Sequence, residues 1–321
     1  LLQRALARDG RDTWALASAI SLHGVHARIL GNNPAQAHLG DWQAACASAD
    51  LARAAADTTL AADPANKFAP DSLAFTLGEQ AQCRLQRLAL DEAEALLQQQ
   101  LAQREEMLRR MPEDMDFRYQ RVVTLAQVAR LRSLQGRHDE ALRGLDDALA
   151  QARAVVQADA GNDGGLQRLR GIGLLRLGAL LAAGRDDLAR RAAEDHLARW
   201  PQPAADDFAG RRPHAEALLW QARAWLGADP GRALASARAA AALMAPARDG
   251  DDNAARRWWL AQALGEQARA LAAQGQQGAA REAARAALAE WQRPAADGRP
   301  LPPPPLLQPW VDAARALAGS G

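Results

Sequence analysis

The sequence predicts an all-α protein, an α-solenoid assembled from antiparallel pairs of helices. Alanine is abundant and β-branched residues are scarce, which favours helices over strands. Apolar residues recur at steps of three and four in long segments, as in Ala141, Leu145, Ala148 and Ala152. Turn signals near positions 40, 90, 136, 184, 228 and 275 divide the chain into units of 44 to 50 residues. Together these observations predict a single domain, residues 1–321, of about six long helical repeats.

The central repeat, residues 115–160, shows why such a unit needs neighbours. On its first helix Val122, Leu125 and Val128 cover more than one face, so this helix must be buried on two sides. Gly136 marks the turn, and the second helix is apolar along one face only. Because one hairpin cannot bury both sides of its first helix, further hairpins must pack against it.

The other segments are predicted to follow the same plan. Residues 1–10 are expected to end a preceding repeat. Helical hairpins are expected at 11–64, 70–112, 163–201, 205–245 and 252–292, followed by a Pro-rich tail and a capping helix at 293–321. Asp12 and Asp41 are predicted N-caps, and either Asp71 or Ser72 is expected to cap the helix after them.

The two ends of the sequence raise separate questions. The chain opens at Leu1, without Met, inside a helical pattern, so we expect a fragment of a longer protein with an unseen upstream domain. The prolines 302–305 cannot be helical. They are either a polyproline ligand for another domain or a strap that lets Leu306, Leu307 and Trp310 cover the last hairpin. The strap is favoured, because terminal repeats require a cover.

Several of these residues resemble tetratricopeptide repeats. The pattern Gly136-x-x-x-Glu140-Ala141 followed by Ala148-Leu149 is similar to the second half of such a repeat, and it returns around Gly184 and Gly275. The units are longer than the usual 34 residues. The array also resembles those appended to bacterial Ser/Thr protein kinases and to nucleotide-cyclase or winged-helix signalling proteins. The resemblance implies a right-handed superhelix whose first helices line a concave groove.

Charge and composition exclude some partners. The net charge of +1 gives no general attraction to nucleic acid or to an anionic membrane, so neither contact is predicted. No apolar run approaches the roughly 18 residues of a membrane span. The compartment stays open between cytoplasm and periplasm, and so does the oligomeric state. Cys46 and Cys83 are expected to be small buried side chains, with a disulfide only if the fold brings them together.

No catalytic residue, metal or cofactor is predicted. His23 and His26 share a helix face, but no third metal ligand lies nearby. Asp249, Asp251 and Asn253 imitate a calcium loop that lacks its glycine and its final glutamate. Gly171 and Gly173 have neither the preceding strand nor the lysine of a phosphate loop. The acids Glu113, Asp114 and Asp116 fit a helix start better than acid–base catalysis.

Arginine and tryptophan are the best candidates for binding a partner, since both are enriched at the energetic centres of interfaces. On predicted first helices these are Arg118, Arg121, Arg130, Trp220, Arg223, Trp225, Trp258 and Arg269. Their alternative role is packing between repeats or pairing with surface acids. We therefore expect a non-enzymatic interaction or sensor module that binds a protein or peptide, an acidic segment above all. The alternative is a helical-repeat enzyme with an unrecognised active site.

Overall fold

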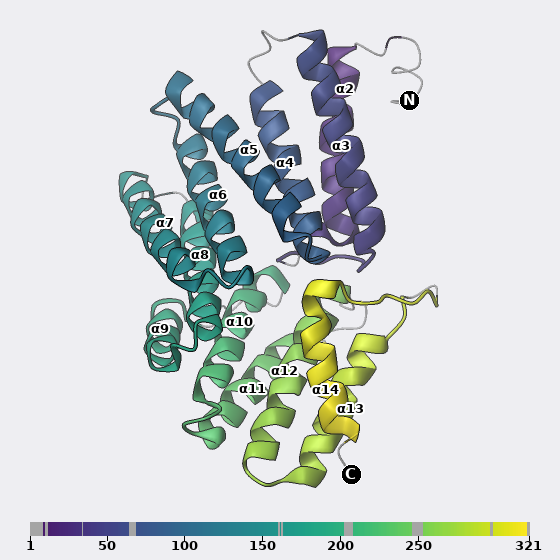
Figure 1. The fold of residues 1–321 in the computed structure, drawn as a ribbon, viewed down its shortest axis with the longest axis vertical. Helices are drawn as coiled ribbons and strands as arrows, with labels where there is room; N and C mark the ends of the chain where they lie inside the picture. The colour runs from purple at the N-terminus through teal and green to yellow at the C-terminus, as the bar shows by residue number, and fades with distance from the viewer. Residues whose placement is uncertain are drawn as a thin grey trace.

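A computed structural model describes residues 9, 12–33, 35–63, 69–159, 161, 163–201, 208–245, 253–295 and 298–319. Within these ranges the chain forms thirteen α-helices and no strand, so the predicted all-α solenoid is confirmed. The predictions for residues 1–8, 10 and 11, and for Asp249 and Asp251, lie outside the described residues. Figure 1 shows the helices following one another through the molecule in chain order.

Twelve of the helices form six antiparallel hairpins. These are α2 (Thr13–Ala27) with α3 (Trp42–Ala62), α4 (Ala69–Gln86) with α5 (Leu90–Arg110), α6 (Met115–Leu134) with α7 (His138–Ala158), α8 (Asp163–Ala182) with α9 (Asp186–Arg199), α10 (Phe208–Trp225) with α11 (Pro230–Met244), and α12 (Ala254–Ala273) with α13 (Gln277–Gln292). A π-helical turn, η1 (Arg28–Asn32), extends α2. A 3₁₀ turn, η2 (Pro305–Leu307), leads into α14 (Gln308–Gly319).

The first helices of the hairpins form the inner, concave layer of the array. Each hairpin packs on the next, and in addition α2 packs on α4, α6 on α8, α8 on α10, and α10 on α12. In the described part of the chain, the second helices of neighbouring hairpins do not pack closely on one another. A curved array brings helices together on its inner side and separates them on its outer side. The first helices therefore line the concave surface, as the sequence analysis expects.

The turns inside four hairpins share one backbone conformation. Gly136, Gly184 and Gly275 each have a positive φ directly after a first helix, and Leu88 occupies that position in the α4–α5 hairpin with φ 59°. The next N–H then reaches back to a carbonyl five residues earlier, as from Arg137 N to Arg132 O at 2.8 Å. This is the Schellman ending of a helix, for which glycine is the usual residue.

The helix starts follow the predicted caps in part. Asp12 Oδ1 accepts from Ala15 N at 3.0 Å and Asp41 Oδ1 accepts from Ala44 N at 3.0 Å, so both are N-caps. The prediction for the next helix is wrong, because α4 already contains Ala69. Asp71 instead forms an ion pair with the buried Arg104 of α5, which joins the two helices of this hairpin.

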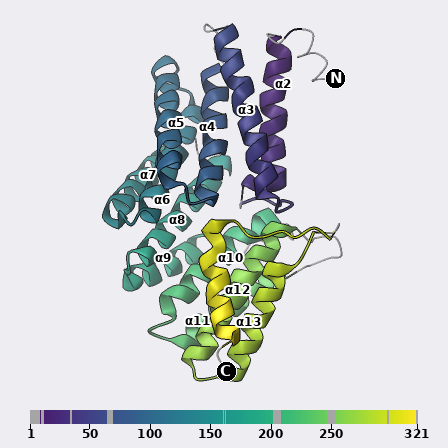
Figure 2. The same cartoon turned by 45° about the vertical axis from the view of Figure 1, so that its right-hand side comes forward.

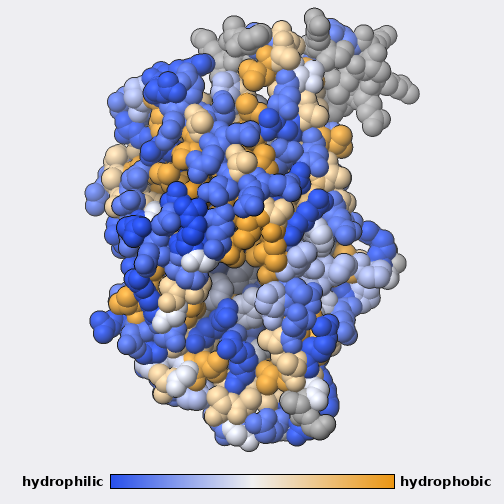
Figure 3. Space-filling view, viewed as in Figure 1, coloured by the Kyte–Doolittle hydropathy of each residue, from blue (hydrophilic) through white to orange (hydrophobic). Residues whose placement is uncertain are grey.

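The two ends of the array meet. The loop between η1 and α3 lies against the start of α12, where Ala254 N donates to His38 O at 3.0 Å and the rings of His38 and Trp258 lie 5.1 Å apart. Figures 1 and 2 show this loop above the C-terminal hairpins, beside the tail that leads to α14. On the face drawn in Figure 3, apolar residues gather near the middle, where the N-terminal and C-terminal hairpins meet.

The Pro-rich tail is a strap, as predicted, although it also holds the first hairpin. Trp42 Nε1 donates to Pro302 O at 3.1 Å, and Arg299 pairs with Asp41 at 3.1 Å. Leu301 is buried in the same cluster as Trp42. The sequence analysis places the strap on the last hairpin alone; the curvature of the array brings the first hairpin into its reach as well.

Candidate functional site

The concave layer opens between α4 and α6, the pair of neighbouring first helices that do not pack closely on each other. A cavity of about 240 Å³ lies there, lined by η1, α4, α5 and α6. Its lining combines apolar side chains with polar ones, which include Gln82, Gln100, Thr124 and Gln127. An added Cβ at Gly78 would lie 2.5 Å from Gln100 Nε2, so the glycine allows Gln100 to approach α4.

Two amides of this cavity have unused hydrogen-bonding atoms. Nε2 of Gln82 and Oε1 of Gln127 are buried and have no partner among the described residues. A buried polar atom without a partner costs free energy, and most such atoms in native proteins are paired. Two residues that line the cavity thus hold one donor and one acceptor that the described chain leaves unpaired.

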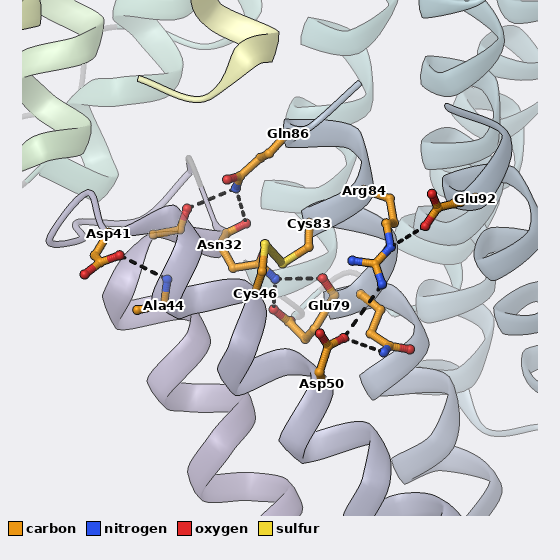
Figure 4. The surroundings of a disulfide bond; sticks show 12 residues. Asn32, Asp41, Ala44, Cys46, Asp50, Glu79, Cys83, Arg84, Gln86 and Glu92 are labelled. Carbon is orange, nitrogen blue, oxygen red and sulfur yellow. Dashed lines mark hydrogen bonds and ion pairs between the residues drawn. A yellow bond between two sulfur atoms is a disulfide. The ribbon is translucent and has the colours of Figure 1, made fainter. Parts of the chain in front are cut away.

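The base of the cavity is held by a buried carboxylate. Glu79 of α4 accepts from Arg28 Nε at 2.7 Å and from Asn32 Nδ2 at 2.8 Å, so the end of α2 is fixed to α4. Gln86 Nε2 donates to Gly31 O at 3.0 Å. Figure 4 shows Glu79, Asn32 and Gln86 clustered around a bond between two sulfur atoms.

That bond is a disulfide between Cys46 of α3 and Cys83 of α4, whose Cα atoms are 5.5 Å apart. The sequence left this pairing open, and the fold settles it by bringing the two helices together. The disulfide closes a loop of 37 residues and joins the first hairpin to the second. The cavity thus lies on a covalently braced part of the array.

Farther along the concave layer, the packed helices α6, α8 and α10 carry Arg130, Arg170, Arg212 and Glu216. Arg212 forms an ion pair with Glu216, one turn away on α10. Burial lowers the pKa of Arg130 while Glu216 opposes this, and burial and Arg212 lower the pKa of Arg170. Burial, with the nearby Arg170 and His214, lowers the pKa of His196 to about 4, so this imidazole is neutral at pH 7.

The α10–α12 end of the layer is occupied by the chain itself. The buried Glu266 pairs with Arg269 at 2.8 Å and with Arg223 at 3.6 Å. The Arg223 guanidinium lies 4.6 Å from the ring centroid of Trp310 on α14, and that ring is 6.2 Å from Trp220. Three residues predicted to line the groove, Trp220, Arg223 and Arg269, thus lie near one another, with Trp310 and Glu266 as their partners.

The other predicted residues point elsewhere. Arg118 binds the turn before α6, donating to Pro112 O at 2.8 Å. Arg121 faces the second-helix layer, where it donates to Gln151 Oε1 of α7 at 2.9 Å. Trp225 packs between Arg190 of α9 and Arg232 of α11. Trp258 is buried under the loop that carries His38.

Sequence reasoning missed Gln82, Gln127, Arg170 and Arg212. A signal existed for Arg212, because Arg212, Glu216, Trp220 and Arg223 follow one face of α10 at steps of four, four and three. No pattern marks Arg170 or the amides, because their role depends on which first helices the curvature brings together.

The weaker candidates have structural partners. His26 Nδ1 lies 2.9 Å from Ser48 Oγ, Asp114 caps α6, and Glu113 pairs with Arg118. Among the described residues, no three His, Cys, Asp or Glu side chains are grouped so that they could hold a metal ion. Nor does the described chain include a helix that is long and apolar enough to cross a membrane.

Comparison with known proteins shows the fold and no more. No model of a protein family matches the chain, and no curated protein matches it. Among solved structures it is similar to the crystal structure of BtubC (BKLC) from P. vanneervenii, with a TM-score of 0.54 and 16% identity. The match covers 76% of this chain and 89% of that one. At this identity the likeness identifies the chain as an all-helical, repeat-like array.

Proposed function

We propose that this chain is a non-enzymatic interaction module whose concave layer binds an extended segment of a partner protein. The observation that carries the proposal is the cavity between α4 and α6, with its unused donor on Gln82 and unused acceptor on Gln127. An extended backbone presents N–H and C=O groups in alternation, which is the pattern that such amides complement.

We further propose that the array is of the tetratricopeptide-like kind and serves as the sensing or partner-recruiting part of a larger bacterial signalling protein. The tetratricopeptide-like kind of array is supported by six hairpins with recurrent glycine turns and by an inner layer of first helices. The role in a signalling protein rests on the resemblance to arrays appended to kinases and cyclases.

The test is selection of peptides from a displayed random library against the whole chain, followed by affinity measurement by fluorescence anisotropy. We expect the Gln82→Leu/Gln127→Leu double variant to bind a selected peptide about tenfold more weakly, because each lost hydrogen bond contributes roughly 0.5–1.5 kcal/mol. Gln99→Leu is the matched control, since Gln99 is exposed on α5. Equal binding by the double variant and the control would contradict the proposal.

A further inference from the structure

We infer that the place where the two ends of the array meet is a recognition site for polyproline-II segments, filled in this structure by residues 299–305 of the chain itself. We call it the tryptophan site and define it by Gly40, Asp41, Trp42 and Trp258. Its ligand is a proline-rich segment of a partner protein, which competes with the chain's own segment. The inference goes beyond the proposed function and does not rest on it, because the tryptophan site shares no residue with the cavity between α4 and α6.

The first step is the conformation of the chain's own segment, which runs beside the loop before α3 in Figures 1 and 2. Its four successive prolines, 302–305, exclude an α-helix, and Pro304 has the polyproline-II angles φ −64° and ψ 155°. Such a helix has about three residues per turn, so residues three apart lie on the same side. Leu301 and Pro304 are buried, whereas Pro302 and Pro305 are exposed. The segment therefore presents one side to the array and the other to solvent.

The second step is the surface that receives the buried side. Leu301 packs in one apolar cluster with Trp42 of α3 and Trp258 of α12. A Cβ added at Gly40 would lie 3.4 Å from Leu301 Cδ1 and only 2.6 Å from Ala254 Cβ, so the glycine lets the segment and α12 approach the loop. Polyproline-II segments are typically bound by aromatic side chains, because the preformed helix loses little conformational entropy on binding. Two tryptophans around a buried leucine supply such a lining.

The third step is a pair of polar contacts that fit the same mode of binding. Trp42 Nε1 donates to Pro302 O at 3.1 Å. A polyproline-II helix has no internal hydrogen bonds, so its carbonyls can accept from a partner. At the start of the segment, Arg299 Nη1 donates to Asp41 Oδ2 at 3.1 Å, while Asp41 Oδ1 caps α3. Because the carboxylate is fixed by the cap, the site also sets the direction of the segment, with its basic residue at the start of α3.

The fourth step is that the segment can leave while the site remains. The side chains of Arg299 and Asp41 are 59% and 24% exposed, and exposed ion pairs are weak. A segment tethered by a short linker binds through proximity, at an effective concentration on the order of millimolar, so few contacts suffice to hold it. The loop is joined to α12 without the segment, since Ala254 N donates to His38 O at 3.0 Å. A partner segment that makes the same contacts can therefore take the place of the chain's own.

The experiment uses the whole chain and two synthetic peptides. The first peptide repeats residues 299–307, Arg-Pro-Leu-Pro-Pro-Pro-Pro-Leu-Leu, and the second has serine in place of the first leucine. Binding is measured by the fluorescence anisotropy of the labelled peptide. The indole ¹⁵N–¹H signal of Trp42, assigned with Trp42→Phe, reports whether its hydrogen bond to a proline carbonyl is made.

Three variants of the chain weaken the segment and leave the tryptophan site unchanged. Leu301→Ser removes the apolar side chain that packs with the tryptophans. Pro304→Ala changes a buried proline of the segment. Pro302→Ala is its matched control, because it changes an exposed proline of the same run and keeps the carbonyl that Trp42 contacts.

We expect the wild type to bind the first peptide weakly, because its own segment competes. Leu301→Ser should bind this peptide at least about tenfold more tightly, and the peptide should return the Trp42 indole signal to its wild-type position. Pro304→Ala should also gain binding, whereas Pro302→Ala should behave like the wild type. Trp42→Phe, added to Leu301→Ser, should weaken binding about fivefold, because one hydrogen bond is lost. A segment with a structural role alone would give a loss of stability and no gain of binding.

Equal affinity of the wild type and Leu301→Ser for the first peptide would overturn the inference. Equal binding of the two peptides, or equal effects of Pro304→Ala and Pro302→Ala, would overturn it as well. If Leu301→Ser does not fold, the comparison of the two proline variants decides. The proposed function is tested through Gln82 and Gln127, so each of the two proposals can fail while the other stands.

Discussion

Two parts of the concave layer differ in what occupies them. Between α10 and α12, Arg223 and Arg269 share the buried Glu266, and Trp310 of α14 lies against Arg223. Between α4 and α6 a cavity of about 240 Å³ remains, and Gln82 Nε2 and Gln127 Oε1 have no partner among the described residues. A polar side chain on this layer is therefore a candidate for binding only where the fold leaves it without a partner.

Removing the disulfide between Cys46 and Cys83 should produce the largest effect on stability. Closing a loop of 37 residues restricts the unfolded chain, which corresponds to about 4 kcal/mol of stability. We expect the Cys46→Ala/Cys83→Ala variant to unfold at lower urea concentration, with faster hydrogen exchange in α4 than in α12. The wild type in reducing agent should behave like the variant, and the variant itself should not respond to reducing agent. An unchanged midpoint for the reduced wild type would refute this.

Glu266→Gln tests the occupied part of the layer, between α10 and α12. It removes the buried anion from Arg223 and Arg269 and should cost about 3 kcal/mol in the free energy of unfolding. Urea unfolding of the variant and the wild type measures this cost. An unchanged midpoint would show that Glu266 does not stabilise this part of the layer.

The stability of the contact between the loop before α3 and the start of α12 should depend on pH, because His38 lies in that contact. Burial first, and Arg257 second, lower its pKa to about 4, against roughly 6.5 in the unfolded chain. The unfolded chain therefore binds more protons between these values, so the stability due to neutral His38 is complete above about pH 6.5 and falls as the pH falls to about 4. Between these two pKa values the free energy of unfolding falls by about 1.4 kcal/mol for each pH unit that the pH is lowered.

This prediction is checked by urea unfolding of the wild type and His38→Gln at pH 7, 6 and 5. In the variant, the free energy of unfolding should depend less steeply on pH, because the contribution of His38 is gone. The contribution of His196, whose pKa is also lowered to about 4, remains in both proteins. Parallel slopes in the two proteins would show that His38 is not the group that titrates.

Much of the fold was predictable because it depends on local patterns. Asp12 and Asp41 cap the helices that follow them, and Ala141 and Ala148 are buried, as their spacing predicts. These features follow from helical periodicity and from the preference of aspartate for helix starts. Each depends on residues within one or two turns, so a single sequence is sufficient.

The candidate site was predictable only in part, because it depends on contacts between distant helices. Arg130, Trp220, Arg223 and Arg269 lie on helices of the inner layer, but nothing in the sequence showed that Trp310 of α14 lies against Arg223. Arg121 lies on the same helix as Arg130 yet turns to α7, because nine residues of helix reverse the direction of a side chain. The curvature that brings the ends together accumulates from small rotations at every hairpin.

The meeting of the two ends changes how this array should fold. An open solenoid has only contacts between neighbouring units, so it can nucleate anywhere and unfold progressively from its ends. Here Trp42 contacts Pro302 across 260 residues of chain, and closing so long a loop is costly in entropy. Once it forms, neither end is free, and the terminal units are held by the same cluster. The unfolding of this array should thus be a single cooperative transition, without the gradual loss of terminal repeats.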